Sequence, residues 1–187
     1  IFLMFSPADP PIHLAVALFS ATVAYAALAW YFPTLVFAFF ALGASIATVV
    51  VGLRVANLAL EWYPTVAAIL AFAYLLLGQG VKRLKAESNV IQSYIKALNT
   101  TSLILIGISV LGAAVLPAVQ LRGQQASFWS AVIALTLASL DLSLCAYFFG
   151  NARYTMLAAG LFIAPFTLAV GRWLAMADVN QSLSWIT

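Results

Sequence analysis

The sequence predicts an all-α, polytopic integral membrane protein: a helical bundle of about six transmembrane helices with short loops. Of its 187 residues, 65% are hydrophobic and only 7% are charged, and the mean hydropathy is +1.09. Soluble domains average about 45–50% apolar and 25% charged residues, so this chain has too few charges to cover a water-soluble fold. We therefore expect residues 1–187 to form a single, multi-pass transmembrane domain in contact with the lipid bilayer.

Six apolar segments have the length that a membrane-spanning helix needs, about 20 residues for a hydrocarbon core of about 30 Å. They lie at about residues 12–31, 33–55, 62–80, 95–119, 127–149 and 154–176. The first two form one apolar run that is interrupted between Trp30 and Thr34, where Pro33 cannot continue a helical hydrogen-bond ladder. We expect a tight turn there. The alternative is one kinked helix, about twice as long as a bilayer requires.

The basic residues predict an orientation. Five of them flank the first, third or fifth loop, and three flank the second loop, the fourth loop or the C-terminus. The first group is Lys82, Arg83, Lys85, Lys96 and Arg153, and the second is Arg54, Arg122 and Arg172. The positive-inside rule then places the loop at residues 82–89 in the cytoplasm or its equivalent, with both ends of the chain on the opposite side.

Asp141 is the most informative polar residue, because it lies inside the fifth segment. We place it about three residues, or roughly 5 Å, from the middle of that helix. An ionisable side chain at this depth is costly, and by default it is a hypothesis for an ion path, a proton relay or a ligand contact. The alternative is a structural acid that binds neighbouring hydroxyl groups or a partner subunit. Small side chains share its helical face and permit close helix packing, at Ser130, Ala134, Ala138 and Cys145.

A second polar cluster lies at the start of the fourth segment. It consists of Asn99, Thr100, Thr101 and Ser102. Because a short loop around Arg122 joins the fourth and fifth segments, we expect them to run antiparallel and adjacent. The cluster would then lie near Asp141, and its hydroxyl groups would donate to the carboxylate. These five residues are the candidates for binding a ligand or an ion.

The remaining reactive side chains support no cofactor or metal. His13 is the only histidine, which excludes a haem held by two histidines of this chain. A single axial ligand to a haem or another pigment stays open as an alternative, although the position of His13 at the start of the first segment favours an interfacial side chain. Cys145 is the only cysteine, and we interpret it as a packing residue. Arg54, Glu61 and Arg172 are expected at the interfaces.

Two classes of function remain open. The first is a non-catalytic, structural or accessory subunit of a larger membrane complex, which would contact other membrane subunits or itself. The second is a component of a small-molecule or ion transporter that uses Asp141. A membrane enzyme is least favoured, because the chain has no clustered acids and a single His and Cys. Bound lipid is expected. The basic residues are spread along the chain, so we predict no nucleic-acid partner.

Overall fold

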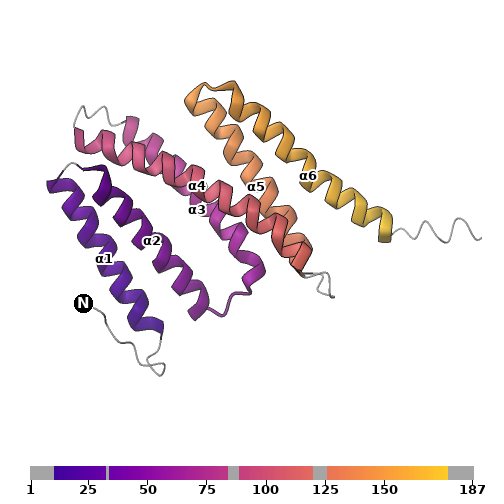
Figure 1. Ribbon diagram of the computed structural model, residues 1–187, viewed down its shortest axis with the longest axis horizontal. Helices are drawn as coiled ribbons and strands as arrows, with labels where there is room; N and C mark the ends of the chain where they lie inside the picture. Colours follow the sequence, from indigo (N-terminus) through magenta and orange to yellow (C-terminus); the bar gives the residue numbers. More distant parts are fainter. Residues whose placement is uncertain (1–10, 33, 84–88, 120–125, 177–187) are drawn as a thin grey trace, which may run out of the picture. The chain divides into compact units, whose positions relative to one another are not determined.

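The computed structural model describes residues 11–32, 34–83, 89–119 and 126–176, and within these ranges it contains helices and no strands (Figure 1). The helices are α1 (Pro11–Tyr31), α2 (Leu35–Val55), the short 3₁₀ helix η1 (Leu60–Trp62), α3 (Tyr63–Arg83), α4 (Asn89–Val119), α5 (Ala126–Phe149) and α6 (Ala152–Met176). All six α-helices are long and apolar enough to cross a membrane. The predicted all-α class with six candidate spans is confirmed.

The interrupted run at the N-terminal end forms two helices and not one kinked helix. Helix α1 ends at Tyr31 and α2 begins at Leu35. The Phe32 amide still donates to the Leu28 carbonyl at 2.8 Å, and the Thr34 amide donates to the Phe32 carbonyl at 2.6 Å. Figure 1 shows α1 and α2 side by side as an antiparallel pair. Pro33, on which this prediction rested, lies outside the described residues.

Two helices end in a residue with left-handed backbone geometry. Asn57 follows α2 with φ +52°, and the Leu58 amide donates back to the Leu53 carbonyl at 2.9 Å, which is the pattern of a Schellman motif. Gly150 follows α5 with φ +61°, and its amide donates to the Ala146 carbonyl at 2.9 Å. These caps satisfy backbone carbonyl groups that the helix itself leaves without partners.

The helices fall into two compact units. The first unit comprises Ile1–Leu60 and Ala73–Leu103, and the second comprises Glu61–Phe72 and Ile104–Thr187. Helices α3 and α4 therefore contribute one half to each unit. The expected single transmembrane domain remains a prediction.

The first unit is built on small side chains. Its buried cluster consists of three alanines, Ala29, Ala38 and Ala97, which come from α1, α2 and α4. Alanine lets the backbones of neighbouring helices approach closely. Such close approach favours helix packing in lipid, where the hydrophobic effect does not drive helices together. A cross-helix hydrogen bond supports this contact: the Tyr94 hydroxyl donates to the Ala26 carbonyl at 2.6 Å. The hydroxyl groups of Ser45 and Tyr74 form a second bond between helices.

The second unit repeats this arrangement. Its buried cluster joins α4 and α5 and is packed against α6; the members are Ala113, Ala131, Ala134 and Leu135, with Val110, Leu161 and Ala164 around them. The start of α3 approaches α4 closely. A Cβ atom placed on Gly112 would lie only 2.9 Å from Cγ of Pro64, so this contact depends on glycine.

Candidate functional site around Asp141

Asp141 is buried in α5, with 2% of its surface exposed. The side chains that share its predicted helical face are buried with it: Ser130, Ala134, Ala138 and Cys145. The burial follows from helical geometry, because these positions recur at intervals of three or four residues and lie on one side of the helix. The interior face of α5 thus carries one acid among small side chains.

One carboxylate oxygen of Asp141, Oδ2, has no hydrogen-bond partner among the described residues. Cys145 lies one turn further along α5 and is also fully buried. A thiol is a weak donor and offers the acid little compensation. A buried polar atom without a partner is costly, and such atoms are rare in folded proteins. Asp141 is therefore equipped to accept a proton or a hydrogen bond from another group.

Ser109 provides a second buried oxygen of this kind in the same unit. Its side chain is 0% exposed, and its Oγ atom has no hydrogen-bond partner among the described residues. Ala113 of α4 and Ala134 of α5 belong to one buried cluster. Ser109 lies four residues before Ala113, and Asp141 lies seven residues after Ala134. With Ala113 and Ala134 taken as level on antiparallel helices, the depths of Ser109 and Asp141 differ by about 4.5 Å.

The sequence did not single out Ser109, although a signal was present. Ser102, Ser109 and Ala113 follow one another on α4 at intervals of seven and four residues, which is the spacing of a single helical face. All three are buried. Extending the hydroxyl cluster along its own face would have identified this residue.

The predicted cluster of α4 divides between environments. Thr101 and Ser102 are buried, whereas Thr100 is exposed and Asn99 is half-buried. Oδ1 of Asn99 has no hydrogen-bond partner among the described residues, and it would lie 2.9 Å from a Cβ atom placed on Gly78 of α3. This cluster belongs to the first unit and Asp141 to the second. Their proposed approach therefore stays a prediction.

Other hydroxyl groups form hydrogen bonds between helices of the second unit. The Ser139 hydroxyl donates to the Ala158 carbonyl of α6 at 3.1 Å. The Thr65 hydroxyl of α3 donates to the Ser130 carbonyl of α5 at 3.2 Å. Sequence patterns did not reveal these bonds, because they depend on how each helix is rotated against its neighbour. They show that buried hydroxyl groups of this unit serve as packing links.

The remaining candidates are placed as follows. His13 is exposed at the start of α1. Glu61, expected at the interface, is 7% exposed, so its side chain is covered. Arg54 is exposed at the end of α2, and the side chain of Arg172 lies outside the described part of the chain. Within the described ranges, no three His, Cys, Asp or Glu side chains gather as a metal site would require.

No protein-family model matches this chain, and no curated protein or solved structure shows significant similarity to it. What defines its class is the fold together with the site: in the described part of the chain, helices that include six candidate membrane spans, with Asp141 buried inside the fifth of these.

Proposed function

We propose that this chain is a multi-pass membrane protein and serves as a non-catalytic subunit of a larger membrane complex. The observation that carries the proposal is the exposure of α1. Only 6% of the most apolar stretch of α1 is buried, the lowest value among the six described spans; α2 and α6 reach 11%, α4 and α5 39%, and α3 44%. Helix α1 therefore uses little of its apolar surface inside this chain.

The exposed surface of α1 combines large and small side chains in the pattern of a helix-packing face. Large side chains project from it at intervals of four, three and four residues: Ile12, Val16, Phe19 and Val23. Small exposed side chains lie between them, at Ala17, Ser20 and Ala24. The Ser20 hydroxyl donates to the Val16 carbonyl at 2.9 Å, so this hydroxyl needs no other acceptor. Small residues between larger ones allow a second helix to approach closely.

Site-specific photo-crosslinking tests this role. A photoreactive phenylalanine analogue at Phe19 should yield one adduct of discrete mass, and the same partner should purify with the chain in constant ratio in mild detergent. A probe at Leu111 of α4, which is also exposed, is the matched control and should yield none. A monodisperse monomer or homodimer without an adduct at Phe19 would contradict the proposal.

A second function is supported by Asp141. We infer as the alternative that the chain is a small-molecule or ion transporter component, with coupling to a proton or cation at Asp141. The buried Oδ2 of Asp141 and Oγ of Ser109, both without hydrogen-bond partners among the described residues, favour this role. They would provide an acceptor and a second buried polar group in the same unit. The substitutions described in the Discussion separate the two functions.

A further inference from the structure

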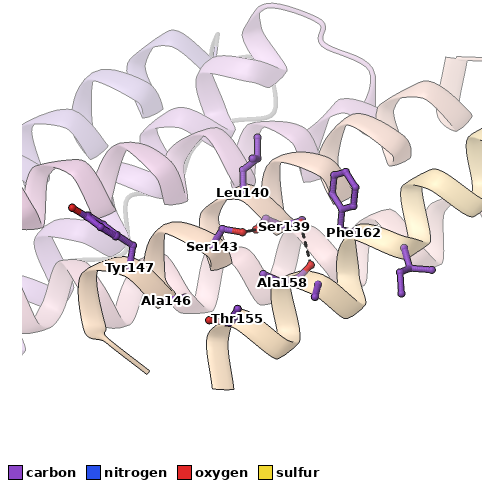
Figure 2. Close-up of a pocket in the computed structure, with 10 residues that line it drawn as sticks. Ser139, Leu140, Ser143, Ala146, Tyr147, Thr155, Ala158 and Phe162 are labelled. Carbon is purple, nitrogen blue, oxygen red and sulfur yellow. Dashed lines mark hydrogen bonds between the residues drawn. The ribbon is translucent and has the colours of Figure 1, made fainter. Parts of the chain in front are cut away.

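An open groove of about 840 Å³ runs between α5 and α6 on the second unit (Figure 2). Each helix contributes five positions spaced as one helical face. The groove is lined by Ser139, Leu140, Ser143, Ala146 and Tyr147 of α5 and by Thr155, Ala158, Ala159, Phe162 and Ile163 of α6. Small side chains occupy its middle, and Figure 2 shows Tyr147 toward one end and Phe162 toward the other.

The serine hydroxyl groups in the groove are already engaged. Ser139 donates to the Ala158 carbonyl at 3.1 Å, a bond drawn in Figure 2. Ser143 donates to the Ser139 carbonyl at 2.9 Å. Both serine hydroxyl groups donate to backbone carbonyl groups, so in the middle of the groove they offer an occupant no hydrogen; the other hydroxyl groups of the lining, on Tyr147 and Thr155, lie toward its end at the turn between α5 and α6. The groove therefore suits a hydrocarbon chain better than a polar ligand.

The length of the groove along α5 is close to the thickness of one leaflet of a membrane. Tyr147 and Ser139 are eight residues apart along α5. They span about 12 Å at the helical rise, against about 15 Å for half of a hydrocarbon core. Leu135, four residues before Ser139 on α5, belongs to a buried cluster against which Leu161 and Ala164 of α6 pack. A transmembrane helix would need a face that crosses both leaflets, whereas an acyl chain needs only one.

A positive charge lies two residues before Thr155, which is the groove-lining residue nearest the start of α6. Arg153 is exposed in the first turn of α6, three residues after the Gly150 turn. The Asn151 side-chain oxygen accepts a hydrogen bond from the Arg153 amide at 3.0 Å, so its amide nitrogen keeps two donors for another group. Between Glu87 and Asp178 the only acid in the sequence is Asp141, which is buried. Asp141 is therefore not available to Arg153, and an external anion could pair with this exposed side chain.

We propose that this groove binds one anionic phospholipid, with an acyl chain along Ala146, Ala158 and Ala159 and the phosphate at Asn151 and Arg153. The predicted orientation places Arg153 at the cytoplasmic leaflet, which is the leaflet rich in anionic lipids. Tyr147, 82% exposed, lies at the depth where amphipathic aromatic rings border the headgroups. The inference rests on the proposed membrane location and not on the role as a subunit.

Native mass spectrometry of the purified chain, released from mixed vesicles of phosphatidylglycerol and phosphatidylcholine with identical acyl chains, tests the proposal. The wild-type chain should retain one phosphatidylglycerol, with about five-fold preference over phosphatidylcholine, as expected for one basic side chain at a membrane surface. Arg153→Gln should remove that preference, and Ala159→Trp should remove retention of both lipids by filling the groove. Arg83→Gln and Ala27→Trp are matched controls at exposed positions of the first unit and should behave as wild type.

Three results would overturn the proposal. The first is equal retention of the two lipids by the wild-type chain. The second is unchanged phosphatidylglycerol retention in Ala159→Trp; if this variant does not fold, Ser143→Phe from the opposite wall replaces it. The third is a wild-type dimer without lipid that dissociates in the groove-filling variant, which would assign the groove to a second copy. Loss of the α1 crosslink would leave lipid retention unchanged, so this test and that of the subunit role fail independently.

Discussion

At the scale of the residue, the fold is organised around polar side chains that an apolar interior must accommodate. Asp141 is the extreme case, because it is buried with an oxygen that has no hydrogen-bond partner among the described residues. Burying a polar group without a partner costs about 1–3 kcal/mol. A folded chain that keeps such a group either uses it in its function or offsets the cost. The cost is offset by a hydrogen bond from a partner or by protonation of the group.

Substitutions of Asp141 test which of these applies. As a structural acid, it should tolerate Asp141→Asn, because the amide has the same shape and still forms hydrogen bonds. Asp141→Leu should lower the unfolding free energy by about 1–3 kcal/mol, since it removes the hydrogen bond that a structural carboxyl group forms with its partner and leaves that partner unsatisfied. Thermal unfolding in detergent and co-purification of the partner measure both effects.

Two outcomes would change this account of Asp141. An Asp141→Asn chain that assembles normally but no longer drives proton or cation flux into vesicles would support the transporter. An Asp141→Leu chain with unchanged stability, assembly and flux would show that the carboxyl group has neither role.

The sequence predicted part of this site. Helical spacing placed Ser130, Ala134 and Cys145 on the face of Asp141, and all three are buried. Spacing within one helix is a local property, so the sequence could reveal it. The partners of a hydroxyl group on another helix depend on helix rotation and register, which a single sequence does not encode locally. For this reason the bond from Ser139 to Ala158 was missed.

At the scale of the element, close approach of helices depends on single glycines. Gly112→Ala should destabilise the chain by about 1–3 kcal/mol, because its Cβ atom would meet the rigid ring of Pro64 at 2.9 Å. Gly107→Ala on the same helix is the control. It has no neighbouring atom within 4 Å of the added Cβ atom, and alanine should there be neutral or stabilising by up to about 1 kcal/mol. Equal thermal stability of the two variants would contradict this contact.

The link from Tyr94 to α1 is also measurable. Tyr94→Phe removes the hydrogen bond to the Ala26 carbonyl and leaves the ring in place. We expect a loss of about 0.5–1 kcal/mol, the range of hydrogen bonds between membrane helices. Tyr31→Phe, which changes an exposed hydroxyl on α1, should change nothing. The bond would be refuted if both variants unfolded at the wild-type temperature.

Helix ends were predicted less well than helix existence. Helix α4 begins at Asn89, whereas the sequence predicted a start near residue 95. The prediction was late because the first turns of this helix contain the polar residues Gln92, Ser93 and Lys96. These polar residues mark the limit of an apolar stretch but do not stop a helix. Apolar length predicts where a chain can cross a bilayer, whereas backbone hydrogen bonding decides where the helix ends.

At the scale of the whole molecule, we propose that the six candidate spans cross a membrane in alternating directions. The described lysine and arginine side chains are all exposed: Arg54, Lys82, Arg83, Lys96 and Arg153. Most of them flank the odd-numbered loops, which the positive-inside rule assigns to the cytoplasm. Because each span crosses the membrane once, consecutive loops must lie on opposite sides of it.

Cysteine accessibility in intact cells tests this claim most directly. In a Cys145→Ser background, single cysteines replace Thr34 before α2, Ala59 between α2 and α3, and Ala152 after α5, all of which are exposed. A membrane-impermeant maleimide should label Ala59→Cys from outside, and should label Thr34→Cys and Ala152→Cys only after the cells are permeabilised. Labelling of all three from the same side would contradict a chain with six alternating membrane spans.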